Sequence, residues 1–187
     1  MQLIFLGPPG AGKGTQAEKL ANQYSIPHIS TGDILRQAIT DKTSLGLQAK
    51  AHVEAGELVP DILIMALMRE RFGQRDVQQG WILDGFPRNL PQAYALDQLL
   101  GIFGQFYTQV VNFRVSADIL IERMLERGRQ DDTETTIRRR LEVYEEETAP
   151  LIDLYQRRRC LTEVNGNLSI AAVTQLLQEN LQSKLPV

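Results

Sequence analysis

The chain has 187 residues, of which 43% are hydrophobic and 23% charged, as expected for one compact domain with an apolar core. No apolar run approaches the roughly 20 residues that a membrane span needs, so we expect no membrane partner. The net charge of −3 argues against a general nucleic-acid binder. The single cysteine, Cys160, permits neither an internal disulfide nor a cysteine-based zinc site, and it suits a reducing, cytoplasmic compartment.

A glycine-rich segment follows the first expected strand. Residues 2–6 are an apolar run, residues 7–15 read GPPGAGKGT, and a helix-compatible stretch comes next. In this context the backbone N–H groups of the loop and the start of the helix can hold phosphate oxygens, and Lys13 adds a full positive charge. An ordinary Gly/Pro turn needs neither the lysine nor so many glycines. Gly14 stands where such loops usually carry Ser or Thr, which leaves a magnesium role for Thr15 open.

Short apolar runs alternate with helical patterns along the rest of the chain. Further strands are expected at residues 26–29, 81–83, 109–115 and 161–164, and helices at 34–39, 40–59, 60–72, 91–100, 118–126, 135–155 and 170–181. The stretch at 135–155 contains a possible interruption at Pro150. The core side chains expected from the helix at 60–72 are Ile62, Leu63, Met65, Ala66, Leu67, Met68 and Phe72. This alternation predicts an α/β fold, with a parallel sheet covered on both faces.

Polar motifs follow several of these strands. The glycine loop, Thr31 and residues 84–88 all come after strands, so they should meet at one edge of the sheet. Asp84 ends a buried strand beside the phosphate loop, which favours binding of a metal or of metal-bound water; capping of the following turn is the alternative. We interpret His28 as a packing or surface residue.

Arginines near these motifs indicate more than one anionic ligand. Arg36 lies one turn beyond the Thr31 turn, and Arg88 closes the segment that begins at Asp84. Unit like charges about 4 Å apart repel by roughly 4 kcal/mol at an effective dielectric near 20, so two phosphorylated substrates need such compensation. Phosphoryl transfer to an anionic acceptor needs no catalytic base. Outside the motifs, pairing with exposed Asp and Glu is the plainer interpretation.

These motifs together resemble those of the adenylate kinase family, in its short-lid type, over essentially the whole chain. The matching segments are residues 7–15, STGD at residues 30–33 with Arg36, DGFPR at residues 84–88 with Gln92, and residues 127–132 leading to Arg140. The resemblance implies a P-loop fold of three layers, α/β/α, with a five-stranded parallel sheet and two small mobile insertions. It implies a core of residues 1–29, 60–125 and 137–187, an AMP-binding insertion at 30–59, and a lid at 126–136. That lid is too short for the hairpin of long-lid relatives, some of which bind zinc, so no zinc is expected.

The resemblance also implies a reaction. The enzyme would be a monomer that converts ATP and AMP reversibly into two ADP, with Mg²⁺ bound with ATP, and it would so balance adenine nucleotides. The residues implied to hold ATP are Gly10, Ala11, Gly12, Lys13, Gly14, Thr15, Arg127 and Leu168. Those implied to hold AMP are Thr31, Arg36, Glu57, Leu58, Val59, Gly85, Phe86, Pro87, Arg88, Gln92, Arg129 and Arg140. Those implied to act on the transferring phosphoryl group are Lys13, Arg88, Arg123, Arg129 and Arg140. Asp84 is implied to organise magnesium through water, and the Phe86–Pro87 bond to be cis.

Two other functions stay in view. Relatives that phosphorylate UMP and CMP resemble this chain in the phosphate loop and DGFPR, but they tend to carry alanine in place of Thr31 and asparagine in place of Gln92. This sequence therefore favours AMP at both positions. A non-catalytic, ATP-dependent switch is the second alternative, and it would need none of the acceptor-side residues such as Arg88.

Overall fold

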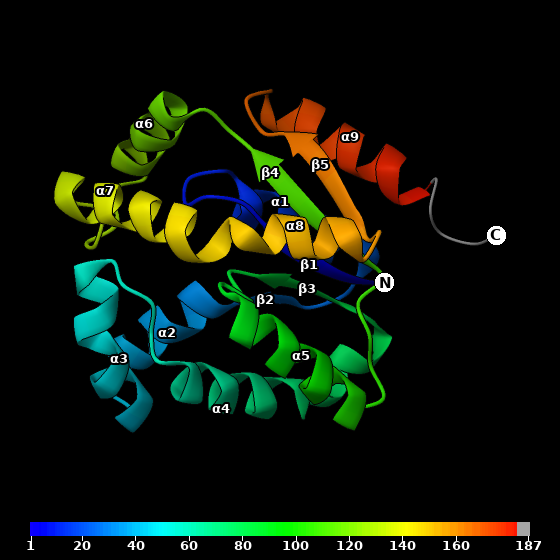
Figure 1. Ribbon diagram of the computed structural model, residues 1–187, viewed down its shortest axis with the longest axis horizontal. Helices are drawn as coiled ribbons and strands as arrows, with labels where there is room; N and C mark the ends of the chain where they lie inside the picture. The colour runs from blue at the N-terminus through cyan, green and yellow to red at the C-terminus, as the bar shows by residue number, and fades with distance from the viewer. Residues whose placement is uncertain (183–187) are drawn as a thin grey trace.

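The computed structural model describes residues 1–182, and a parallel sheet of five strands forms their centre (Figure 1). The strand order is β2-β3-β1-β4-β5, and every neighbouring pair is parallel. The strands are β1 (Gln2–Leu6), β2 (His28–Ser30), β3 (Trp81–Asp84), β4 (Gln109–Arg114) and β5 (Leu161–Asn165). The predicted five-stranded parallel sheet is thus confirmed.

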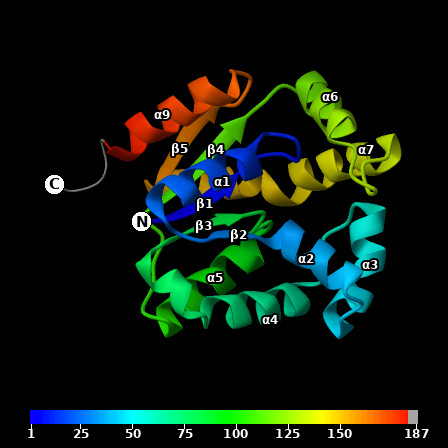
Figure 2. The ribbon, with the colours of Figure 1, turned by 180° about the vertical axis from the view of Figure 1, so that it is seen from behind.

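Helices lie on both sides of the sheet, so the predicted three layers are also confirmed (Figures 1 and 2). The α-helices are α1 (Lys13–Tyr24), α2 (Thr31–Thr40), α3 (Ser44–Ala55), α4 (Asp61–Phe72), α5 (Leu90–Ile102), α6 (Ala117–Arg127), α7 (Glu134–Val143), α8 (Pro150–Arg157) and α9 (Ile170–Gln182). A 3₁₀ helix, η1 (Arg75–Gln79), precedes β3, and a π-helical segment, η2 (Tyr144–Thr148), joins α7 to α8. None of these helices is long and apolar enough to cross a bilayer, within the described part of the chain.

Strand β1 shows how the sequence divides the core. Side chains of successive strand residues point to opposite faces, and β1 is buried on both. Ile4 and Leu6 pack with α4, α5 and α8, whereas Leu3 and Phe5 pack with α1, α6 and α9. Because helices cover both faces, the strand reads as a continuous apolar run instead of an alternating one.

Helix α4 departs from the prediction in two of its side chains. Ile62 is 79% exposed and Ala66 is also exposed, so their assignment to the core is wrong. Ile64, Met68 and Phe72 are buried and recur at the spacing of one helix face. Ile62 and Ala66, four residues apart, share the opposite face. An apolar run without polar breaks does not show which face turns inward.

The predicted interruption near Pro150 is present, as a π-helical turn directly before it. The N–H of Ala149 donates to the carbonyl of Tyr144 at 2.8 Å, an i→i−5 bond, and Pro150 then opens α8. Proline has no N–H to continue the helical ladder, and π turns of this kind are often found at functional sites. Here the turn brings Thr148 against the segment after β3.

Candidate active site

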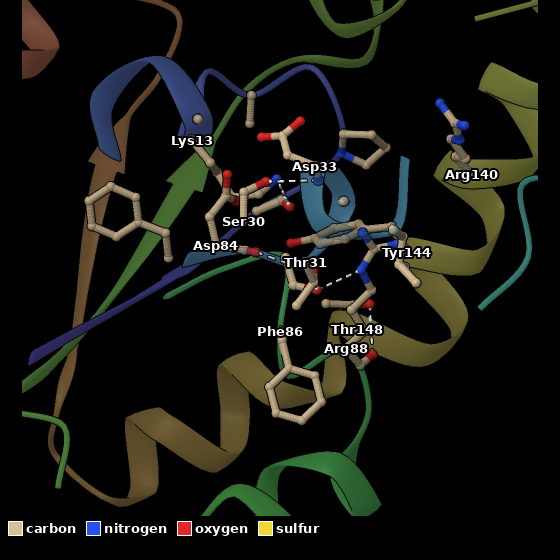
Figure 3. Close-up of a pocket in the computed structure, with 18 of the residues that line it drawn as sticks. Lys13, Ser30, Thr31, Asp33, Asp84, Phe86, Arg88, Arg140, Tyr144 and Thr148 are labelled. Atoms are coloured by element: carbon tan, nitrogen blue, oxygen red, sulfur yellow. Dashed lines mark hydrogen bonds between the residues drawn. The ribbon is translucent and has the colours of Figure 1, made fainter. Parts of the chain in front are cut away.

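A cleft of about 590 Å³ lies at the edge of the sheet where β1, β2 and β3 end (Figure 3). Its walls come from the loop after β1, the start of α2, the segment after β3, and residues of α7 and η2. Ligands of open α/β sheets bind at this edge. In Figure 3, Lys13 and Asp84 lie together on one side, and Arg140 lies across from them.

The loop after β1 has the backbone that a phosphate-binding loop needs. Gly10 and Gly12 have φ of 84° and 89°, in the left-handed region that glycine adopts without steric cost, and α1 begins directly after them at Lys13. The first N–H groups of a helix lack intrahelical partners and carry partial positive charge. The loop and the helix start therefore form one anion-binding surface.

Lys13 supplies the charge of this surface. Its Nζ donates to the carbonyls of Gly7 and Pro8 at 2.8 and 2.9 Å. Burial lowers the pKa of Lys13 to about 8; nearby Asp84 opposes this shift, whereas Arg88 and Arg127 add to it. A bound anion would favour the charged ammonium and reverse the shift.

Asp84 ends β3 at the floor of the cleft. A Cβ built on Gly14 would lie 3.5 Å from its Oδ2, so the carboxylate faces the first turn of α1. Its side chain is 12% exposed, and Nε2 of His28 lies 3.4 Å from Oδ2. The interpretation of His28 as a packing or surface residue is therefore incomplete, because it lines the cleft beside the carboxylate. A carboxylate next to a phosphate loop suits a hard cation such as Mg²⁺, which keeps most of its water ligands.

Thr31 begins α2 directly after β2. Ser30 caps this helix, because its Oγ accepts the N–H of Asp33 at 3.2 Å. The Thr31 hydroxyl is buried and donates to the carbonyl of Gly85 at 2.9 Å. Its proton is thus used within the protein, and its lone pairs remain for a ligand.

Arg88 is held by bonds from three directions. Its side-chain Nε donates to the carbonyl of Gly85, and its backbone N–H donates to Oε1 of Gln92. Its backbone carbonyl accepts a hydrogen bond from the hydroxyl of Thr148, and each of the three bonds is 2.8 Å long. Burial lowers the pKa of Arg88, and the charges of Arg140 and Arg36 add to this while Asp84 opposes it. Arginine stays protonated in proteins, so several cations face one space and favour an anionic ligand.

The neighbouring Phe86 is among the residues that line the cleft, but its ring extends into the core and only 1% of the residue's surface is exposed (Figure 3). The peptide bond between it and Pro87 is cis, as the resemblance implies.

The arginines at the end of α6, in the segment that follows it and on α7 have acidic partners in this structure. Arg127 binds Asp132 at 2.8 Å, and Arg140 binds Asp132 at 3.0 Å and also Asp131. Burial raises the pKa of Asp132, but the bonds and charges from Arg127 and Arg140 outweigh it and the net pKa is lowered. Arg129 lies 3.6 Å from Asp33 of α2, so this segment reaches across the cleft.

Comparisons with known proteins agree with this geometry. A profile of the adenylate kinase family matches residues 5–160. The chain is 55% identical to adenylate kinase 1 of Nostoc sp. over 182 residues, which cover 97% of this chain and 99% of that one. It is 55% identical to adenylate kinase 1 of Synechocystis sp., with 95% of each chain covered. It is 49% identical to an adenylate kinase of Corynebacterium urealyticum, with 90% and 93% covered.

The chain belongs to the adenylate kinase family. It is therefore a nucleoside monophosphate kinase. The sequence predicted this class of enzyme from three segments: the phosphate loop, the Thr31 turn and the segment after β3.

Most of the site residues predicted from the family resemblance lie together in the cleft. The lining includes every residue predicted to hold AMP or ATP except Leu168, and it includes Asp84. Leu168 is 39% exposed, and neither it nor Arg123 is among the described residues that line the cleft. Arg123 instead donates from Nη1 to the carbonyl of Gly166 at 2.9 Å, in the turn after β5.

The lining also includes polar residues that were not predicted as site residues, among them His28, Tyr144 and Thr148. His28 lies in the short β2, where its position next to Asp84 depends on the pairing of β2 with β3. Tyr144 and Thr148 belong to the π-helical turn, and burial, followed by the charge of Glu145, raises the pKa of Tyr144 to about 12. The only sequence signal for this turn is Pro150, which indicates a break but not the side that it presents to the cleft.

Proposed function

We propose that this member of the adenylate kinase family transfers the γ-phosphoryl group of MgATP to AMP, giving two ADP, and so balances adenine nucleotides. The observation that carries this proposal is that Lys13, at the start of α1 directly after the first loop, and Arg88, from the loop after β3, line one cleft. Cations from two separate segments suit two phosphorylated substrates that must approach each other. A single nucleotide would need only the first loop.

The donor is assigned to the loop after β1. In this proposal the N–H groups of residues 10–15 hold the ATP phosphates, and Lys13 stabilises the negative charge that develops during transfer. Arg127 joins them from the end of α6. Arg123 and Leu168 lie outside the cleft lining. We assign Leu168 to the adenine end of ATP, whereas Arg123, which donates to the carbonyl of Gly166, stays assigned to the transferring phosphoryl group.

The acceptor is assigned to the other wall. Arg36 and Arg88 would hold the AMP phosphate, with Arg129 and Arg140 shared between the two substrates. Residues 57–59 and 85–87 would surround the nucleoside, and Thr31 and Gln92 would contact the base. The Thr31 hydroxyl already donates to Gly85, so it can only accept a hydrogen bond from a base, as a 6-amino group requires.

The chemistry needs alignment and charge compensation. An oxygen of the AMP phosphate attacks Pγ while the bond from Pγ to the bridging oxygen of the departing ADP breaks. The acceptor is already an anion, so no side chain has to remove a proton. Mg²⁺ would neutralise phosphate charge. Asp84 fits as its protein contact, through water, because its carboxylate faces the first turn of α1 beside the phosphate loop. Lys13, Arg88, Arg123, Arg129 and Arg140 would stabilise the charge spread over the transferring group.

Closure of the two insertions would exclude water. We propose that residues 30–59 and 126–136 move against a core of residues 1–29, 60–125 and 137–187. Contacts between them support this: Asp33 faces Arg129 at 3.6 Å, and the hydroxyl of Thr136 lies 3.4 Å from the carbonyl of Glu54. Water that reached the site would accept the phosphoryl group, so closure should suppress hydrolysis of ATP.

The test is an acceptor panel of AMP, CMP, UMP and GMP with MgATP, followed by coupled detection of ADP, with a parallel assay without acceptor. We expect rapid turnover with AMP alone and little hydrolysis in its absence. Faster turnover with CMP or UMP would move the enzyme to the pyrimidine kinases. Tight ATP binding with no transfer to any acceptor would support a switch instead.

We further propose that the enzyme works as a cytoplasmic monomer. The single cysteine supports a reducing compartment, and the cleft that would hold both substrates is lined by residues of one chain. Sedimentation at assay concentration checks the monomer.

A further inference from the structure

The Gln92 side chain is buried at the base end of the cleft with both ends of its carboxamide bonded. It is 2% exposed and lines the cleft. Its Oε1 accepts the N–H of Arg88 at 2.8 Å, and its Nε2 donates to Oδ1 of Asp61 at 2.7 Å. The N–H of Gln92 donates to Oδ1 of Asn89 at 2.9 Å, which fixes the start of α5.

The two partners decide which way the carboxamide is turned. A backbone N–H can only donate a hydrogen bond, and an ionised carboxylate can only accept one. Turning the amide by 180° would place Nε2 against the N–H of Arg88 and Oε1 against the carboxylate of Asp61. Both bonds would be lost and two like-polarity contacts would replace them. Buried polar groups without partners are strongly disfavoured.

The locked amide still has bonding capacity for a ligand. A carboxamide has two N–H donors and two lone pairs on oxygen, and the protein uses one of each. One N–H and one lone pair remain. A 6-aminopurine offers a donor, its amino group, beside an acceptor, N1, and this pattern matches the amide as it is held. A 6-oxopurine offers the reverse, an acceptor at O6 beside a donor at N1.

We propose that Asp61 is a positioning residue that makes the acceptor site select a 6-aminopurine monophosphate over a 6-oxopurine one. This rests on the proposed function, which puts the base of the monophosphate against Gln92. Asp61 is the first residue of α4 and is not among the described residues that line the cleft, so it acts through Gln92. Its carboxylate lies at a helix N-terminus, where negative charge is favoured, and Nδ2 of Asn89 lies 3.5 Å from the same Oδ1.

Asp61→Asn tests the lock without changing its shape. The amide of residue 61 can present either an acceptor or a donor, so it no longer rejects a turned Gln92, and only the backbone N–H of Arg88 still opposes the turn. AMP and IMP are the paired substrates, because they differ only at the 6-position and the N1 proton. We expect the ratio of kcat/KM for AMP to that for IMP to fall by roughly tenfold or more, with KM for ATP unchanged.

Two further variants test whether a change in the ratio comes from the loss of the bond between Asp61 and Gln92. Asp118→Asn removes the same charge from the first turn of α6, where the side chain is exposed, and should leave the AMP to IMP ratio unchanged. Asp61→Ala admits water, which can donate or accept, and should lower the ratio as Asp61→Asn does. Calorimetry gives the ratio of the Kd values of AMP and IMP, which should change in the same direction and does not depend on turnover.

The outcomes separate this inference from the function on which it rests. If AMP and IMP lose efficiency by equal factors in Asp61→Asn, Asp61 has only a structural role and the inference is overturned. If the wild-type enzyme does not use AMP, the proposed function fails whatever the variants do. A fall in the AMP to IMP ratio in both Asp61 variants, but not in Asp118→Asn, supports the lock.

Discussion

The two walls of the cleft are built in different ways. The proposed donor wall is mainly one continuous stretch, in which backbone N–H groups and Lys13 can hold an anion. The acceptor wall draws side chains from α2, the segment after β3 and α5, and other side chains hold them: Asp61 holds Gln92, and Thr148 holds Arg88. On the proposed assignment the donor wall would recognise charge, whereas the acceptor wall would recognise the polarity of a particular base. Substitutions should therefore remove catalysis on one side and redirect or weaken a single substrate on the other.

The largest effect is expected from Lys13→Ala. The lysine addresses charge that develops in the transition state, so its loss should lower kcat by about 10²–10⁴-fold, several kcal/mol, in steady-state assays with MgATP and AMP. Lys19→Ala is the matched control, because Lys19 lies on the exposed face of the same helix. Thermal unfolding should show that both variants fold. Wild-type turnover in Lys13→Ala would contradict the assignment of the ATP phosphates to this wall.

Arg88→Ala should separate the two walls. Loss of a charge-assisted contact to the acceptor phosphate should cost about 3 kcal/mol in kcat/KM for AMP, with a much smaller change in the Kd of ATP. Arg138→Ala is the control, since Arg138 is an exposed arginine paired with Glu134 on α7. An equal loss for both nucleotides would mean that Arg88 acts by supporting the segment after β3.

These two residues also show how much could be predicted from the sequence. Lys13 belongs to a motif contained in nine consecutive residues, and the sheet follows from short apolar runs between helical patterns. Arg88 was predicted as a site residue for two reasons: it follows a strand at the edge of the sheet where ligands bind, and it belongs to a motif of the family. The lock on Gln92 was not predicted, because it depends on how α4 packs beside α5, and a lone Asp61 at a helix start reads as an ordinary first-turn carboxylate.

Side-chain networks were harder to predict than helices and strands, because they depend on how distant parts of the chain pack together. Asp61, His28 and Thr148 each contact a site residue distant in the chain. Such contacts are set by strand register and helix packing, which local patterns do not encode. The outward turn of Ile62 has the same origin, because an uninterrupted apolar stretch has no polar face to orient it.

The pH dependence of binding should differ between the walls. Burial lowers the pKa of Lys13 to about 8, and a bound polyphosphate should raise it. ATP binding at pH 8.5 should therefore take up most of one proton, and the Kd of ATP should rise as the pH increases above 8. AMP binding should take up none, because Arg88 stays protonated.

Calorimetry in two buffers of different ionisation enthalpy measures this proton uptake. Lys13→Met should still show weak ATP binding at high protein concentration, but without proton uptake. Uptake that persists in Lys13→Met would assign the titration to another group. Uptake of equal size on AMP binding would remove the distinction between the two walls.

The smallest effect is expected from Glu57→Gln, which tests how the acceptor wall uses residues 57–59. The Glu57 carboxylate binds Nε of Arg139 on α7 at 2.6 Å, and both side chains are exposed. The bond to Arg139 lowers the pKa of Glu57. Exposed pairs of this kind contribute little, so KM for AMP should change by less than roughly threefold, and the change should shrink further at high salt. A rise in KM comparable to that of Arg88→Ala would mean that the carboxylate itself contacts the acceptor. A small effect instead limits Glu57 to its backbone groups, and it leaves base and phosphate recognition to the side chains that the protein holds in place.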